Sequence, residues 1–223
     1  MKLTYDQFVG MVDHTLLKPE ATRAAVDKLC EEARDLGTAS VCVNSYWVAT
    51  VSEKLQGSSV LTCSVIGFPL GAMHPEALVV EARTAIAEGA DEIDMVLPVG
   101  LVHGGQWKAA REVISAVRDA TAGTTLKVIL EVALLSRGQI HEASRMCLEL
   151  GADFIKTSTG FNSAGGATVE AVLVMRNAVG DSCGIKASGG IRTAADVEAM
   201  VEAGATRLGL SGTVGIAEEL RAG

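Results

Sequence analysis

Eight strand-like stretches alternate with helix-like stretches along the chain, and this alternation limits the possible folds more than any other feature. The apolar, β-rich stretches are MVDHTL (11–16), TASVCVN (38–44), SVLTCSVIGF (59–68), DEIDMVL (91–97), TLKVILEV (125–132), DFIKTS (153–158), CGIKAS (183–188) and TRLGLS (206–211). Strands that alternate with helices pair in parallel through right-handed crossovers. Eight such units fit a closed barrel better than an open doubly wound sheet. We therefore predict a single (β/α)8 TIM barrel domain over residues 1–223.

Glycines mark the ends of the predicted helices. Apolar residues recur at helical spacing over 19–36, 74–88, 136–150 and 193–203, and a glycine follows each range. Glycine is the preferred residue just beyond a helix end. Three of these ends have the sequences EGADEI, LGADFI and AGATRL, which indicates a repeated unit of helix, Gly-Ala turn and strand. A short helix over 5–10 precedes the first strand and is expected to cap the barrel floor.

Charge and cysteine content narrow the class of protein. The net charge of −8 argues against nucleic acid or an anionic membrane as a partner. The five cysteines are odd in number and form no C-x-x-C pair, so we expect reduced core thiols in a cytoplasmic protein. The start, MKLTYDQFVG, has no apolar h-region, and no apolar run reaches about 18 residues without a charge. Neither a signal peptide nor a transmembrane span is expected.

Two of the predicted strands carry a lysine in an apolar setting, Lys156 in DFIKTSTG and Lys186 in CGIKASGG. Burying a lone ammonium group costs several kcal/mol, so unpaired lysines are almost never fully buried. One such lysine could extend into water from a strand end. Two of them, each followed by small polar and glycine residues, favour a functional site. In a (β/α)8 barrel, functional groups lie at the C-terminal ends of the strands.

Strand alternation predicts which side chains share the lumen with these lysines. Successive side chains point to opposite faces of a strand, so Phe154 and Ser158 accompany Lys156, and Gly184 and Ser188 accompany Lys186. The same reasoning places in the lumen Asp13, Thr15, Asp94, Lys127 and Glu131. Buried charges must pair, so three lysines facing three carboxylates could also form a purely structural network. Such a network, however, does not need the glycine-rich loops beside two of the lysines.

Those loops are SGGIR (188–192) and LSGT (210–213), which follow the seventh and eighth predicted strands. In barrels this is a common phosphate site, formed by loop amides and a helix N-terminus. Gly189 and Gly190 let the backbone approach a phosphate closely, and Ser211 and Gly212 stand just before the last helix. We therefore predict a small phosphorylated ligand, although a Gly-Gly pair alone also fits a tight turn.

A lysine near such a ligand suggests Schiff-base chemistry. A neutral amine attacks a carbonyl and forms an electron sink for breaking the adjacent C–C bond. The ordinary pKa of lysine is about 10.4. A second ammonium roughly 5 Å away, at an effective dielectric constant of about 20, adds about 3 kcal/mol of repulsion, or roughly two pKa units. Lys186 is therefore a sufficient activator of Lys156, and Asp94 could move protons through a water molecule.

A metal-dependent mechanism is not favoured by the sequence. The histidines form no H-x-H or H-E-x-x-H motif, and His14 is expected to point outward from its strand. Cys42 could face the pocket, although a small core thiol is its more ordinary role. No cofactor or metal is expected.

The residues described above resemble those of the deoxyribose-phosphate aldolase family, whose members are Schiff-base-forming class I aldolases with a (β/α)8 barrel. The resemblance covers essentially the whole chain. It is carried by DHTLL with Asp13, VCVN with Cys42, EIDMVLP with Asp94, LKVILE with Lys127, DFIKTSTGF with Lys156, GIKASGGIR with Lys186, and LGLSGT. It implies reversible cleavage of 2-deoxy-D-ribose 5-phosphate to acetaldehyde and D-glyceraldehyde 3-phosphate.

The resemblance also implies residue roles. Lys156 would form the Schiff base, and Asp94 and Lys186 would transfer protons. The substrate-binding candidates are Asp13, Thr15, Cys42, Lys127, Thr159, Gly160, Gly189, Gly190, Arg192, Ser211 and Gly212. Some members carry a lysine after the glycine of TSTG, where this chain has Phe161, so Arg192 and the loop amides are expected to bind the phosphate. Some longer members end in a tyrosine tail, whereas this chain ends EELRAG.

Two alternatives remain open from the residues alone. One is another lysine-dependent lyase that acts on a different phosphorylated sugar. The other is a non-catalytic barrel that binds phosphosugars. We also expect a homo-oligomer, because barrels with exposed apolar helix faces often dimerise.

Overall fold

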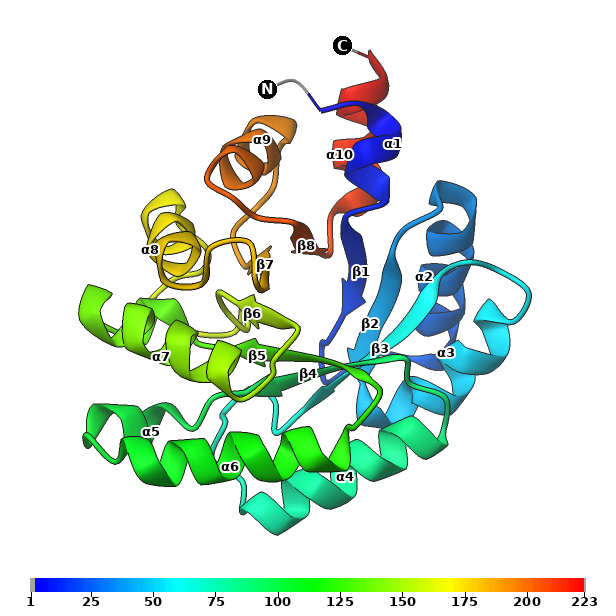
Figure 1. Cartoon of the computed structure of the whole chain (residues 1–223). Coiled ribbons are helices and arrows are strands. Elements are labelled where there is room, and N and C mark those ends of the chain that lie inside the picture. The colour runs from blue at the N-terminus through cyan, green and yellow to red at the C-terminus, as the bar shows by residue number, and fades with distance from the viewer. Residues whose placement is uncertain (1–2, 223) are drawn as a thin grey trace.

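The computed structural model describes residues 3–222, and within them eight parallel strands close into a barrel in chain order (Figure 1). The strands are β1 (Val12–Leu16), β2 (Ser40–Asn44), β3 (Leu61–Ile66), β4 (Glu92–Val96), β5 (Thr125–Ile129), β6 (Phe154–Lys156), β7 (Gly184–Ser188) and β8 (Arg207–Leu210). Each lies inside one of the eight stretches predicted from the sequence. The predicted (β/α)8 TIM barrel is therefore confirmed.

Helices surround the barrel and separate successive strands (Figure 1). They are α1 (Tyr5–Val9), α2 (Arg23–Leu36), α3 (Val48–Leu55), α4 (Pro75–Ala87), α5 (Val99–His103), α6 (Trp107–Ala120), α7 (Arg137–Glu149), α8 (Val169–Val179), α9 (Ala194–Glu202) and α10 (Thr213–Ala222), with 3-10 turns η1 (Ser45–Trp47) and η2 (Val132–Leu134). No helix within residues 3–222 combines the length and the apolar composition that crossing a membrane requires.

The strand register brings the chemically important side chains to the same level of the barrel. Asp94 on β4 stands opposite Lys127 on β5. Lys156 on β6 stands opposite Lys186 on β7. Residues at alternate positions pack outward into the main hydrophobic core against the helices, as do Ile93, Met95, Ile155 and Ile185. This alternation separates a charged lumen from an apolar outer layer.

The predicted helix ends are also confirmed. Gly37, which follows α2, adopts a left-handed conformation with φ 73°, and its N–H donates to the carbonyl of Ala33. The glycines after the other three predicted ranges also have positive φ. A side chain at such a position would strain the backbone, which explains why glycine recurs there.

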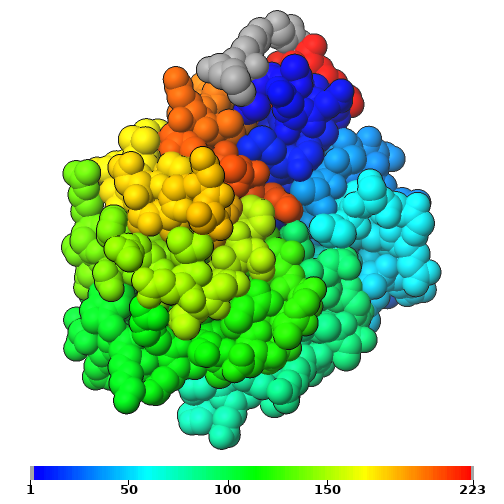
Figure 2. All heavy atoms as spheres, viewed as in Figure 1, coloured from blue at the N-terminus to red at the C-terminus, as the bar shows by residue number. Residues whose placement is uncertain are grey.

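The two ends of the described chain lie side by side. The short helix predicted before the first strand is present as α1, and Thr4 and Gln7 form a capping box at its start. It packs along α10, where the Arg221 guanidinium lies 4.2 Å from the centre of the Tyr5 ring. Figure 2 shows the two helices in contact at one edge, and side chains fill the centre of this face.

Candidate active site

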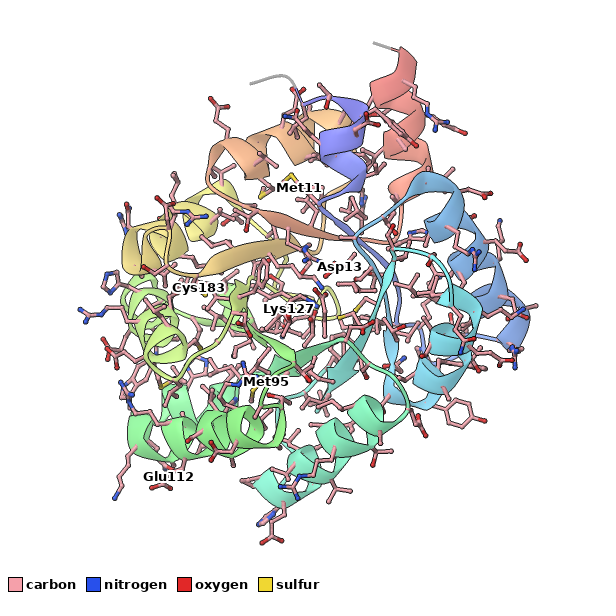
Figure 3. The ribbon with its side chains drawn as sticks, turned by 45° about the vertical axis from the view of Figure 1, so that its right-hand side comes forward. Met11, Asp13, Met95, Glu112, Lys127 and Cys183 are labelled. Carbon is pink, nitrogen blue, oxygen red and sulfur yellow. The ribbon has the colours of Figure 1, made fainter. Side chains whose placement is uncertain are left out.

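A network of charged side chains fills the barrel lumen. Within residues 3–222, its members are the cations Lys127, Lys156, Lys186 and Arg207 and the carboxylates Asp13, Glu92 and Asp94. They come from β1, β4, β5, β6, β7 and β8. Asp13 and Lys127 point toward the centre of the barrel from opposite walls (Figure 3). The lumen is therefore a packed ionic cluster rather than an apolar core.

Asp94 is the carboxylate shared by all three lysines. Its Oδ2 accepts hydrogen bonds from Lys156 at 2.8 Å and Lys186 at 2.7 Å. Its Oδ1 accepts from Lys127 at 2.9 Å. Burial opposes the ionisation of Asp94, but the three ammonium groups outweigh this and hold its pKa well below the ordinary value. Asp94 is therefore an anion throughout the physiological range.

The lysines differ in how many carboxylates they contact. Lys127 Nζ lies 2.5 Å from Glu92, 2.9 Å from Asp94 and 3.4 Å from Asp13. Lys186 Nζ lies 2.5 Å from Asp13 and 2.7 Å from Asp94. Burial opposes protonation of both lysines, but these carboxylates outweigh it and raise both pKa values.

Lys156 has a different environment from the other two lysines. Within the part of the chain that the structure describes, Asp94 is its one carboxylate partner. Lys156 also borders a cavity of about 350 Å³. It is the one network member among the cavity residues, which are Thr15, Leu16, Leu17, Lys18, Lys156, Thr159, Gly160, Phe161, Ser188, Gly189, Gly209 and Ser211. Lys156 is therefore the network lysine that a carbonyl compound in the cavity can reach.

The loops after β6 and β7 form one side of this cavity and touch each other. Gly189 has φ 87°, and a Cβ there would lie 3.1 Å from the Cα of Gly166 and 3.2 Å from that of Gly160. The Ala167 N–H donates to the carbonyls of Ser188 and Gly189. Glycine at position 189 is therefore required both by the backbone conformation and by the close approach of the two loops.

Gly209 on β8 provides space inside the lumen. A Cβ at this position would lie 2.9 Å from Cβ of Ser188 and 3.1 Å from Cε of Lys186. The glycine therefore leaves room for the Lys186 side chain to reach Asp13 and Asp94.

The structure brings together about half of the predicted substrate-binding residues. Thr15, Thr159, Gly160, Gly189 and Ser211 line the cavity with Lys156, as expected. Three predicted residues are fully buried and lie beyond its lining, namely Asp13, Cys42 and Lys127. Asp13 and Lys127 contact the network instead of the cavity.

Three other predicted residues, Gly190, Arg192 and Gly212, do not line the cavity. Arg192 is thus not placed at the cavity, and its contact with the ligand stays a prediction. After β7 ends at Ser188, the chain turns away toward α9. The Arg192 side chain is exposed, and the backbone N–H of Arg192 donates to the Asp196 carboxylate. A different cation, Lys18, borders the cavity from the loop after β1.

The predicted position of Glu131 in the lysine network is wrong. Strand β5 ends at Ile129, two residues earlier than strand alternation assumed, and Glu131 adopts a left-handed conformation with φ 56°. Its carboxylate accepts hydrogen bonds from the backbone N–H and the hydroxyl of Thr159. Glu131 therefore holds the loop after β6 at the cavity edge.

Glu92 and Arg207 were not identified from the sequence, although alternation could have found both. Glu92 is two residues from Asp94 on β4, and Arg207 is two residues from Gly209 on β8. Arg207 Nη1 lies 2.7 Å from Asp13, and its Nη2 lies 3.2 Å from Glu92. Its guanidinium also stacks 5.2 Å from the centre of the Phe154 ring.

His14 points away from the lumen, as predicted. Its Nδ1 lies 2.8 Å from the hydroxyl of Thr213, and its Nε2 lies 2.9 Å from the Glu32 carboxylate. Burial lowers the pKa of His14 despite the nearby Glu32. The histidine therefore joins β1 to α2 and α10 in the outer layer.

Cys42 and Cys63 face each other in the lumen beside Asp94. Strand register pairs the two residues. A hydrogen bond from Cys63 lowers the pKa of Cys42, while burial raises that of Cys63. Their sulfur atoms and an oxygen of Asp94 lie within 4.8 Å of one another, close enough to hold a metal ion. Both oxygens of Asp94 are, however, already bonded to lysines.

Comparison with known proteins identifies the family. The model of the DeoC/LacD family aldolases matches residues 4–217. The chain belongs to this family. The resemblance to an aldolase family, which the lysine segments suggested, is therefore confirmed.

Relatives named deoxyribose-phosphate aldolase match almost the full length of the chain. The deoxyribose-phosphate aldolase of Brevibacillus brevis is 52% identical over 205 residues, which cover 92% of each chain. That of Geobacillus sp. (strain WCH70) is 51% identical over 209 residues, or 93% of each chain. The tetrameric deoxyribose phosphate aldolase of Aeropyrum pernix has a similar structure, with a TM-score of 0.91 at 33% identity over 99% of this chain and 94% of that chain.

Proposed function

We propose that the chain is a deoxyribose-phosphate aldolase, which reversibly cleaves 2-deoxy-D-ribose 5-phosphate into acetaldehyde and D-glyceraldehyde 3-phosphate. The observation that carries this proposal is the position of Lys156. It borders the cavity and has one carboxylate partner within residues 3–222, whereas Lys127 and Lys186 have more. Of the three lysines, Lys156 is therefore the one that meets the substrate.

The reaction begins with addition of the neutral Lys156 amine to the aldehyde carbon of the open-chain sugar. Loss of water from the resulting carbinolamine gives an iminium ion. Asp94 lies 2.8 Å from Lys156 and 2.7 Å from Lys186. This arrangement supports proton exchange between the reacting amine and Lys186 through the carboxylate or an associated water molecule.

Cleavage then breaks the bond between the second and third carbons of the sugar. The electron pair of that bond moves toward the iminium nitrogen and forms an enamine. The hydroxyl on the third carbon gives its proton to a water molecule associated with Asp94 and becomes the aldehyde of D-glyceraldehyde 3-phosphate. Protonation of the enamine carbon and hydrolysis of the imine release acetaldehyde and restore Lys156. The charge on Lys186 favours the neutral amine at the start of this cycle.

The phosphate of the substrate binds at the loops after β6, β7 and β8. Gly160, Gly189 and Ser211 line the cavity there, and α10 begins at Thr213, just after Ser211. The N-terminus of that helix and the loop amides favour an anion. Lys18 adds a positive charge at the cavity edge in place of the expected Arg192.

The proposal is tested by comparing aldol donors with purified protein. Acetaldehyde should condense with D-glyceraldehyde 3-phosphate, and dihydroxyacetone phosphate should not replace it. Lys156→Ala should abolish condensation without changing the thermal unfolding temperature by more than a few degrees. Preference for dihydroxyacetone phosphate would indicate a different lysine-dependent lyase, and binding of the sugar phosphate without turnover would indicate a non-catalytic barrel.

We also infer a homo-oligomer and a cytoplasmic location. Exposed apolar side chains, among them Leu70, Val80 and Leu173, support an interface between copies of the chain. The Aeropyrum pernix relative is tetrameric. The five cysteines, all free and buried, support a reducing compartment. Light scattering after size-exclusion chromatography tests the assembly, and a monomer would contradict it.

A further inference from the structure

The lumen network has more positive than negative side chains. Within residues 3–222 it contains four cationic side chains and three carboxylates when all of them are ionised. A buried cluster at low dielectric favours charge balance because an uncompensated charge is costly there. Balance is reached when one cation loses its proton.

Arg207 cannot be that cation. A guanidinium remains protonated in proteins, and here burial, which opposes the charge, is outweighed by Asp13 and Glu92, which raise its pKa. Arg207 therefore contributes a fixed positive charge to the network, although it lies away from the cavity where Lys156 is reached.

Arg207 makes its shorter bonds to carboxylate oxygens that the lysines leave free, and its Nη1 also lies 3.4 Å from the Glu92 Oε2 that Lys127 holds. It bonds to Oδ1 of Asp13 and Oε1 of Glu92. The lysines bond to the other oxygens, with Lys186 on Oδ2 of Asp13 and Lys127 on Oε2 of Glu92. The guanidinium thus compensates part of the negative charge on two carboxylates, which would otherwise favour protonation throughout the lumen.

We propose that Arg207 is a positioning residue whose charge, held by Asp13 and Glu92, makes Lys156 the cation that gives up its proton. The inference rests on the proposed function, in which Lys156 is the nucleophile. It adds a role for a side chain that the substrate does not touch. Arg207 holds the carboxylates in place and sets the charge balance, while the reacting atoms remain at Lys156.

The proposal predicts opposite effects for the two partners. Arg207→Gln removes a cation and keeps hydrogen-bonding capacity, so the network is balanced with Lys156 still protonated. Glu92→Gln removes an anion, so loss of the Lys156 proton is further favoured. For charges roughly 10 Å apart at an effective dielectric constant of about 20, each change shifts the titration of Lys156 by about one pH unit. The shift is upward for Arg207→Gln and downward for Glu92→Gln.

The experiment measures the rate at which borohydride traps acetaldehyde on Lys156 at a series of pH values between 5 and 10, which gives a pH profile for each variant. The double variant Arg207→Gln/Glu92→Gln loses one charge of each sign, so its profile should return to that of the wild type. If the trapping rate of the double variant instead falls by the combined losses of the two single variants, charge balance is overturned and the role of Arg207 is merely structural. An unmoved profile in both single variants would also overturn it.

Control variants separate charge from packing. Arg207→Lys keeps the charge and should retain the wild-type profile. Arg221→Gln removes an arginine that also stacks on an aromatic ring, that of Tyr5, but at the surface beside α1, and should leave the profile unchanged. Thermal unfolding of each variant checks that the barrel is intact.

Lys18 borders the same cavity as Lys156, from the loop after β1. Further titratable or charged groups beside Lys156 or Arg207 come from six strands. They are Asp13 (β1), Cys42 (β2), Cys63 (β3), Glu92 and Asp94 (β4), Lys127 (β5) and Lys186 (β7). Because Cys42 could titrate in the same range, the profiles are repeated in a Cys42→Ser background. If the wild type is not trapped at all, the proposed function fails. If it is trapped but the single variants do not shift, only the present inference fails.

Discussion

Replacement of Lys186 by leucine should raise the pH at which Lys156 becomes reactive. Both ammonium nitrogens bond to the same oxygen of Asp94, at 2.8 and 2.7 Å, so they lie no farther apart than the two distances together, about 5.5 Å. At an effective dielectric constant of about 20, their repulsion is about 3 kcal/mol, or roughly two pKa units. Deleting the Lys186 charge also leaves Asp13 and Asp94 less compensated, which acts in the same direction.

The assay is kcat/KM for cleavage of 2-deoxyribose 5-phosphate across pH. In Lys186→Leu, the increase of kcat/KM on the basic side should move upward by one to two units. Lys186→Arg keeps the charge, so its profile should move little, but its rate should fall because a guanidinium does not release a proton readily. A large loss of rate in Lys186→Leu with an unmoved profile would refute electrostatic activation. Lys186 would then act in proton transfer alone.

The remaining predictions concern the phosphate loops and stability. Ser211→Asp should raise KM for the phosphorylated sugar at least tenfold more than KM for unphosphorylated deoxyribose, because a carboxylate repels phosphate. An equal rise of KM for both sugars would show that the phosphate binds elsewhere. Gly189→Ala should lower the free energy of unfolding in urea by about 1–3 kcal/mol, because φ is 87° and two backbones approach there. Burial acts to raise the pKa of Asp13, but the charges of Lys127 and Lys186 outweigh burial and lower this pKa in the folded protein. Ionisation of Asp13 therefore stabilises the fold above the unfolded pKa of about 3.9. This stabilisation is lost as the pH falls below that value toward the folded pKa. The melting temperature should therefore decrease below about pH 4, and less steeply in Asp13→Asn.

The strand pattern of the sequence predicted the barrel and the residues of its centre because both depend on the same period of two. Lys127, Lys156 and Lys186 lie where alternation along regular strands puts them, and so does Asp94. Glycines predicted to end helices do so because their backbone conformation is a local property. These features needed no knowledge of distant contacts.

Prediction failed where the backbone leaves a regular strand. Glu131 follows the end of β5 in a left-handed conformation, so alternation no longer gives its direction. Arg192 lies beyond the turn after β7, and only the path of the loop decides that Lys18 reaches the cavity instead. The number of carboxylates around each lysine also depends on side chains from opposite walls of the barrel, which a strand pattern does not provide.

Covalent trapping of acetaldehyde shows directly whether Lys156 is the Schiff-base nucleophile. The protein is incubated with acetaldehyde, reduced with borohydride, digested and mapped by mass spectrometry. We expect one reduced ethyl adduct on the peptide that contains Lys156, and no stable labelling of Lys127 or Lys186. Labelling of Lys186 in place of Lys156, or the same yield of adduct in Lys156→Ala, would contradict it.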